Sequence, residues 1–370
     1  MDFTYDEELI EVRNLARAVF SRESTPERVR EVEREGGGFD ARLWHELGKS
    51  GLLGIAISES SGGAGLGFGG LCSVLTEQGA HLAQVPVWPS AVAAIALEEF
   101  GAADQKAQLV PAMAEGHSRI TLALEEFGNH DCAAPRCSAR TVSGAWALSG
   151  TKAVVPFFAG ADHVLVSAAT DSGTGLFLVD SDAAGVRWDA TETTARGGSG
   201  TLTMDATSAI RIGEGRAGVL NWVLERARVA IAALQIGVAE RALELTAGYV
   251  TSREQFGRPL GTFQAVQHQL ADSYMGIDAM RVCLWRAVEV IDSRESDETA
   301  SHIAKWWSDE QGVKVVDTAV HVHGGVGVDV DSPVHRYYLW GHQLAGALGG
   351  SRSELAALGT ALAAGSMPQL

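Results

Sequence analysis

The sequence predicts a mainly α-helical protein with a β-rich insert, and the changes of hydrophobic periodicity along the chain indicate this class. From residue 5 to about 116, apolar residues such as Leu9 and Val12 recur at helical spacing. Between residues 120 and 212 the chain has short β-prone runs separated by Gly, Asp and Ser. Helical periodicity returns at Ala217 and continues, which predicts a helical domain, a β-domain and a helix bundle in that order.

The first predicted domain, residues 1–118, is helical. Its main interruption is the glycine-rich stretch 60–67, SSGGAGLG. A phosphate-binding P-loop would need a following Lys-Ser/Thr and a strand-helix unit around it, and the sequence has neither. We therefore interpret this stretch as a loop between helices.

The second predicted domain, residues 119–213, is a small antiparallel barrel or sandwich. Short, evenly spaced strands leave no room for the crossover helices that a parallel sheet requires. The expected strands are Ile120–Leu124, Ala145–Leu148, His163–Ser167, Gly175–Val179, Val186–Trp188 and Thr201–Met204.

The third predicted domain, residues 214–370, is an antiparallel four-helix bundle. A long apolar stripe begins after Ala217, and three further helices are expected over 263–291, 299–321 and 334–364. The polar segment 293–298 is expected to be a surface turn between two of them.

Composition excludes several classes of function. The net charge of the 370-residue chain is −17, which repels a nucleic acid backbone, so no nucleic acid partner is expected. No long apolar run or basic N-terminal leader is present, so we expect neither a membrane span nor secretion. The four cysteines lack CxxC spacing and suit a reducing cytoplasm.

No metal site is expected. His321 and His323 face different sides of a helix and lack an evident third ligand.

Several motifs across the chain carry a family resemblance. The first domain has Gly51–Ile55 leading into Glu59–Leu66, followed by Glu77-Gln78-Gly79. The bundle has Arg253-Glu254-Gln255-Phe256-Gly257, and later His323-Gly324-Gly325-Val326-Gly327. In this order and spacing, the motifs resemble those of the acyl-CoA dehydrogenase family. The resemblance implies the fold derived above, an FAD cofactor, and oxidation of an acyl-CoA thioester to its 2,3-enoyl form.

The resemblance also implies which residues contact FAD. In the family, the arginine of the RxxFG segment reaches the diphosphate of a neighbouring subunit's FAD, and a guanidinium suits this role because it gives paired charge-assisted hydrogen bonds. Glycines in the second motif let backbone approach a cofactor closely. His321 stands where the family usually has Gln. The expected cofactor-binding residues are Arg253, Gln255, Phe256, Gln264, His321, Gly324 and Gly325.

The catalytic carboxylate of the family is missing at both positions where the resemblance places it. Most members carry a Glu where this chain has Leu348, and a minority carry it where this chain has Ala227. Glu225 is two residues early, about 200° around a helix, so it is expected to be a solvated acid and serves only as a fallback base. Glu354, six residues after Leu348, is also out of phase.

The flavin-facing part of the β-domain also departs from the family pattern. Glu125-Glu126 stands in place of a Thr-Glu pair, and the segment after Gly150-Thr151-Lys152 has Val154 and Pro156 in place of a Trp and a Thr. The part that contacts a neighbour's cofactor is retained, whereas the part that holds the flavin ring and base is lost.

This combination resembles the base-less subunit of heterotetrameric acyl-CoA dehydrogenases of actinobacterial sterol side-chain degradation. The resemblance implies a second subunit that carries the catalytic Glu, a steroid side-chain CoA ester as a plausible substrate, and an electron-transfer flavoprotein as the usual acceptor. One alternative is a self-sufficient homo-oligomeric dehydrogenase or oxidase with a displaced base, Glu225 or Glu126. The other is a cofactor-free scaffold of the same fold.

Overall fold

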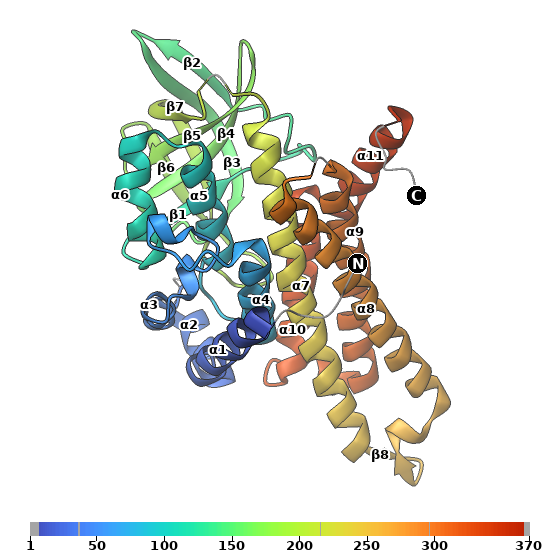
Figure 1. Ribbon diagram of the computed structural model, residues 1–370. Helices are drawn as coiled ribbons and strands as arrows, with labels where there is room; N and C mark the ends of the chain where they lie inside the picture. Colours follow the sequence, from blue (N-terminus) through green and yellow to red (C-terminus); the bar gives the residue numbers. More distant parts are fainter. Residues whose placement is uncertain (1–6, 36–37, 215, 296, 366–370) are drawn as a thin grey trace. The chain divides into compact units, whose positions relative to one another are not determined.

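The computed structural model describes residues 7–35, 38–214, 216–295 and 297–365, and Figure 1 shows its helices and strands. The chain forms two compact units. One comprises the residues up to Pro26, Cys72–Ala83 and the chain from Arg228 on; the other comprises Glu27–Leu71 and Gln84–Ala227. The predicted helical start at residue 5, and residue 296 of the predicted turn, lie outside the described residues.

The unit formed by Glu27–Leu71 and Gln84–Ala227 combines short helices with a barrel. Its helices are α2 (Pro26–Glu35), α3 (Ala41–Lys49), the 3-10 turns η1 (Leu52–Gly54) and η2 (Glu59–Ser61), α5 (Val87–Phe100) and α6 (Ala103–Ala114). Asp40 begins α3 because its carboxylate accepts hydrogen bonds from the backbone N–H groups of Arg42 and Leu43 at 3.1 and 3.2 Å.

The β-domain is a barrel of seven strands. They are β1 (Ile120–Ala123), β2 (Ser138–Val142), β3 (Ala145–Val155), β4 (His163–Thr170), β5 (Gly173–Asp180), β6 (Val186–Thr191) and β7 (Ser199–Ile212). The strand order is β1-β4-β2-β3-β7-β5, the pairing of β4 with β5 closes the ring, and β6 pairs with β7. Val164, Phe177 and Leu202 are among the residues that fill its core.

Two features of the barrel differ from the sequence prediction. Most strand pairs are antiparallel, but β1 and β2 both pair with β4 in parallel. The β2–β3 hairpin lies between β1 and β4 in sequence and supplies the crossover, so no helix is needed. Strand β2 was not predicted, because its sequence, SARTV, has only one strongly apolar residue.

The other unit is a helix bundle. Its long helices are the later part of α7 (Val219–Ser252), α8 (Gln264–Ser293), α9 (Glu298–His323), α10 (Pro333–Gly346) and α11 (Gly350–Ala363), joined by α1 (Glu7–Glu23) and the later part of α4 (Gly67–Ala80). Short elements connect them: β8 (Glu254–Gln255), β9 (Arg258–Pro259), and the 3-10 turns η3 (Leu260–Thr262), η4 (Gly324–Val328) and η5 (Ala347–Gly349).

The expected single helix over 334–364 is wrong, because it divides into α10 and α11 at η5. Leu348, Gly349 and Gly350 have consecutive φ values of 57°, 93° and 69°. Three left-handed residues in a row cannot continue a right-handed helix, and the two glycines adopt this conformation without steric cost.

Helices α4 and α7 approach each other at backbone distance within the bundle unit. A Cβ built on Gly79 would lie 2.1 Å from the carbonyl oxygen of Leu234, and one built on Gly237 would lie 1.9 Å from that of Thr76. Each helix therefore presents a glycine to a carbonyl of the other, and neither position has room for a side chain.

No helix in the described part of the chain is long and apolar enough to cross a membrane.

Candidate functional site

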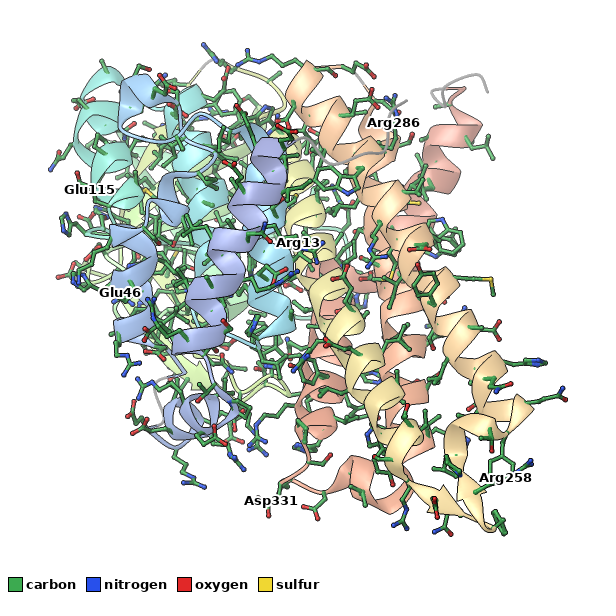
Figure 2. All side chains as sticks on the ribbon, turned by 60° about the horizontal axis from the view of Figure 1, so that its bottom comes forward. Arg13, Glu46, Glu115, Arg258, Arg286 and Asp331 are labelled. Carbon is green, nitrogen blue, oxygen red and sulfur yellow. The ribbon has the colours of Figure 1, made fainter. Side chains whose placement is uncertain are left out.

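The predicted cofactor-binding residues gather at one end of the helix bundle. Helices α7 and α9 end there, and α8 and α10 begin there, because consecutive helices of the bundle run in opposite directions. The rings of Tyr249 in α7 and His323 in α9 stack with centroids 4.2 Å apart, which joins the two helix ends. Figure 2 shows Arg258 and Asp331 at this end.

A two-stranded hairpin projects from this end of the bundle. Glu254 and Gln255 of β8 pair with the residues of β9, and Phe256 and Gly257 form the two-residue turn with φ values of 55° and 80°. Two successive positive φ values are typical of the tight hairpin turn whose twist matches the strands. The turn leaves 91% of the Phe256 side chain exposed.

The Arg253 guanidinium lies beside this hairpin and has no charged partner in the described part of the chain. The backbone of Arg253 is fixed, since its N–H donates to the Tyr249 carbonyl at 2.9 Å and its carbonyl accepts from the N–H of Leu260 at 2.8 Å. Its side chain is exposed and has no ion pair or hydrogen bond with any described residue. By contrast, the guanidinium of Arg258 lies over the Phe263 ring at 4.1 Å. Arg253 is therefore available for an anionic group such as a diphosphate.

The glycine motif forms an open loop at the same end. A Cβ added at Gly324 or Gly325 would meet nothing within 4 Å, and Gly324 has a φ of 63°. Gly327 is different, because its Cβ would lie 2.7 Å from the carbonyl oxygen of Val320. Gly327 is thus required for packing. Gly324 and Gly325, by contrast, expose their backbone, so a ligand can approach it closely.

The remaining predicted contacts, Gln255, Gln264 and His321, are also exposed at this end. Gln264 is the first residue of α8, and His321 is in the last turn of α9. The site thus combines a guanidinium that no described residue pairs, exposed amides and open glycine backbone, and this set fits a cofactor with a diphosphate. The described residues contain no group of three or more His, Cys, Asp or Glu residues placed to hold a metal ion.

The two positions at which the sequence predicted the loss of a catalytic base are both buried. Leu348 lies in the η5 break with only 3% of its surface exposed, and Ala227 is fully buried. Glu225 is not solvated as expected, because its side chain is 20% exposed and forms an ion pair with Arg226 at 3.0 Å.

The other candidate base, Glu126, is held in a buried ion pair inside the barrel unit. Its carboxylate accepts hydrogen bonds from Lys152 Nζ at 2.7 Å and from the backbone N–H groups of Arg136 and Cys137 at 2.7 and 2.9 Å. Lys152 also donates to Ser167 Oγ at 2.8 Å. Burial raises the pKa of Glu126, but these three donors outweigh it and lower the pKa to about 2. Such a carboxylate is a weak base.

Glu354 is the centre of a second buried ion cluster, which the sequence did not predict. It projects from α11 and is 1% exposed. Arg228 Nε of α7 lies 3.1 Å from Oε1 and 3.0 Å from Oε2 of Glu354, and His302 Nδ1 of α9 contacts Oε2. Burial raises the pKa of Glu354, but His302 and Arg228 lower it below its ordinary value.

Helix α9 carries a further buried ion pair one turn after His302. Lys305 Nζ donates to both carboxylate oxygens of Asp309 at 2.6 and 2.7 Å, and to the Leu344 carbonyl at 3.3 Å. Burial raises the pKa of Asp309 to about 7, even though Lys305 lowers it. His302, Lys305 and Asp309 have spacings of three and four residues, so ionisable residues on one face of a mostly buried helix were the available sequence signal.

Comparisons with known proteins give the family. Residues 6–117 match the family model described as "Acyl-CoA dehydrogenase, N-terminal domain", and residues 213–355 match "Acyl-CoA dehydrogenase, C-terminal domain". The chain belongs to the acyl-CoA dehydrogenase family, whose members depend on FAD. The fold predicted from the sequence, mainly α with a β insert, is confirmed.

Similar proteins include mycobacterial acyl-CoA dehydrogenases and one whose title names a steroid ACAD. Acyl-CoA dehydrogenase FadE27 of Mycobacterium tuberculosis is 39% identical over 376 residues, which cover 98% of this chain and 99% of the relative. A structure titled "Tcur3481-Tcur3483 steroid ACAD G363A variant" has a TM-score of 0.94 and 54% identity, covering 97% of this chain and 99% of that one. The ChsE4-ChsE5 complex of Mycobacterium tuberculosis has a TM-score of 0.93 and 36% identity, with both chains covered completely.

Proposed function

We propose that this chain is the FAD-completing subunit of a heteromeric acyl-CoA dehydrogenase and that it lacks a catalytic base of its own. Two related structures carry titles that name two different chains each. One of those titles names a steroid acyl-CoA dehydrogenase, so the proposed substrate is the CoA ester of a steroid side chain. An electron-transfer flavoprotein is the proposed electron acceptor.

The observation that carries the proposal is a contrast within the bundle unit. At one end, Arg253, Gly324 and Gly325 are open for a diphosphate-bearing cofactor. At the base position, however, Leu348 is a buried aliphatic residue. A chain with this contrast supplies binding groups to a cofactor but cannot remove a proton from the acyl group at the usual place.

The proposed roles of the two subunits follow from the chemistry of acyl-CoA oxidation. When bound, FAD supplies the hydride acceptor for the β-carbon of the acyl group. The proposed partner supplies the glutamate that removes the α-proton. In this chain, Arg253 would neutralise the diphosphate, Gly324 and Gly325 would allow close backbone approach, and Gln255, Phe256, Gln264 and His321 would line the contact.

The alternative with a displaced base is less well supported. Glu126 is held ionised by Lys152, and Glu225 is paired with Arg226. Glu354 is buried between Arg228 and His302. Each of these carboxylates already has a cationic or hydrogen-bonding partner. The cofactor-free alternative gives no reason for Arg253 to be left without a partner among the described residues.

The test is to express this chain alone and together with a candidate acyl-CoA dehydrogenase partner. Bound FAD is measured by absorbance, and activity by reduction of a dye with steroid and straight-chain acyl-CoAs. We expect FAD and activity only from the co-expressed complex. In that complex, Arg253→Ala should reduce FAD retention at least tenfold, since one charge-assisted contact to a phosphate is worth about 1.5–3 kcal/mol.

The matched control is Arg140→Ala, which removes an exposed arginine from β2 of the barrel. It should leave FAD content unchanged. A lone chain that purifies with stoichiometric FAD and oxidises an acyl-CoA would contradict the proposal and favour a displaced base.

A further inference from the structure

The β8–β9 hairpin is too short to hold its position by itself. It has two residue pairs, Glu254 with Pro259 and Gln255 with Arg258, and it lies at the tip of the bundle, as Figure 1 shows. An isolated two-stranded hairpin is at best marginally stable in water, even when it has more pairs than this one. Contacts with residues outside the hairpin must therefore set its position.

Phe263, the residue immediately before α8, supplies two such contacts from one ring. The guanidinium of Arg258, which Figure 2 labels, lies over the Phe263 ring at 4.1 Å from its centroid. The ring of Phe256, in the turn of the hairpin, meets the Phe263 ring edge-on, with centroids 6.1 Å apart and an interplanar angle of 78°. These are the geometries of a cation–π contact and of a T-shaped aromatic pair. The Phe263 ring thus holds both β9 and the turn.

The Phe263 ring is itself fixed through its backbone. Its N–H donates to the Leu260 carbonyl at 3.1 Å, and its carbonyl accepts from the N–H of Gln267 at 3.0 Å. The Gln267 side chain also donates to the Gly261 carbonyl at 2.9 Å. The segment that joins the hairpin to α8 is therefore closed by local hydrogen bonds, and the half-buried Phe263 ring is a fixed support for the hairpin.

Arg253 lies at the base of the hairpin that this ring supports. The Arg253 carbonyl accepts from the N–H of Leu260 at 2.8 Å, so a movement of β9 also moves the backbone of Arg253. No described residue pairs with the Arg253 side chain, so its direction depends on its backbone. A binding group that is already in position costs less conformational entropy when its ligand binds.

We propose that Phe263 is a positioning residue that acts through Arg258 and Phe256. It holds the hairpin so that Arg253 faces the diphosphate of the cofactor. This inference rests on the function proposed above. The charge of Arg258 acts on the Phe263 ring and not on the cofactor, so the two arginines beside the hairpin turn have different roles.

The test measures the Kd for FAD of the cofactor-depleted complex with the partner subunit, from the change in flavin fluorescence during titration. We expect Phe263→Leu to raise this Kd about three- to tenfold, because leucine offers no π face to Arg258 or Phe256. Phe263→Tyr keeps the ring and should retain the wild-type Kd. The matched control is Tyr274→Leu, which removes an aromatic ring that is 56% exposed in the same helix and should leave the Kd unchanged.

A second comparison separates positioning from packing. In the Arg253→Ala background, Phe263→Leu should have no further effect on the Kd for FAD, because the guanidinium that Phe263 positions is absent. An effect of the same size in both backgrounds would overturn the proposal. It is also overturned if Phe263→Leu lowers the melting temperature of the complex and leaves the Kd unchanged, since Phe263 then serves packing alone.

Two further outcomes identify which inference is wrong. If Arg258→Gln raises the Kd for FAD and Phe263→Leu does not, Arg258 contacts the cofactor directly and only the positioning role is wrong. If Arg253→Ala leaves the Kd unchanged, the proposed function loses the contact on which it depends, and the positioning role of Phe263 fails with it.

Discussion

Lys152 Nζ lies 2.7 Å from Oε1 of Glu126, and both side chains are almost completely buried in the unit that contains the β-barrel. Two buried charges in such an environment are stable only together, because either one alone would lose its hydration without compensation. Glu126, one of the two carboxylates considered as a displaced base, is therefore paired with a cation inside this unit. The ion pair and hydrogen bonds of Glu126 stabilise the fold of this unit.

Removing the lysine should destabilise the chain strongly. We expect Lys152→Met to lower the free energy of unfolding by about 3–5 kcal/mol, because an uncompensated carboxylate remains buried. Urea unfolding followed by circular dichroism measures the change. The double variant Lys152→Met/Glu126→Gln should recover much of the loss, since it removes both charges. Equal stability of the single and double variants would mean that the charge at Glu126 is not the cause.

The same pair should make stability depend on pH in the acid range. The pKa of Glu126 is about 2 in the folded chain, below its ordinary value of 4.5. Its ionised form therefore stabilises the fold above pH 4.5, and this contribution is lost as the pH falls toward 2. The difference in unfolding free energy between wild type and Glu126→Gln should shrink over this window. A difference that stays constant with pH would contradict the ion pair.

Asp309 should give the opposite pH dependence. Burial raises its folded pKa to about 7, compared with an ordinary value of 3.8. Its contribution is therefore complete below pH 3.8 and is lost as the pH rises through about 7. We expect the wild type to lose stability between about pH 5.5 and about pH 8 relative to the neutral double variant Lys305→Met/Asp309→Asn. Denaturant unfolding of both proteins at the two pH values is the measurement.

The close contact between α4 and α7 should be intolerant of a single methyl group. Gly237→Ala would place a Cβ 1.9 Å from the Thr76 carbonyl oxygen, so we expect a loss of about 1–3 kcal/mol from overpacking. Gly248→Ala on the same helix is the matched control, because its Cβ would meet nothing within 4 Å. That control should be neutral or stabilising by up to about 1 kcal/mol, because alanine favours helix. Thermal unfolding distinguishes the two.

Much of the fold could be predicted from periodicity alone. The long apolar stripes of α7, α8 and α9 are local patterns, and each appears as a helix near its expected bounds. The break at Leu348 was missed because a leucine does not indicate a left-handed conformation. The two glycines that follow, Gly349 and Gly350, were the available signal for a break in the helix. Strand β2 was missed because its place is set by its neighbours in the barrel and not by its own composition.

Part of the candidate site could likewise be predicted from the sequence, and part could not. Motif residues such as Arg253 and Gly324 stand at helix ends, so a bundle with consecutive antiparallel helices brings them to one end of the unit. The ion cluster of Arg228 and Glu354 could not be predicted, because its members are 126 residues apart in sequence. Their meeting depends on the rotation of α7 and α11 about their axes, which only the packed structure defines.

Arg13 of α1 donates to Glu77 of α4 at 2.7 Å and to Glu240 of α7 at 2.7 Å, and this bridge has a consequence for how the chain folds as it is made. Arg13 and Glu240 are 227 residues apart, so at about 5–20 residues per second a ribosome needs roughly 10 to 45 s to supply the second acid. During that time the barrel unit, which ends at Ala227, can be completed. Helix α1 can therefore contact Glu77 of α4 early, but its bridge to Glu240 forms only after α7 has been made.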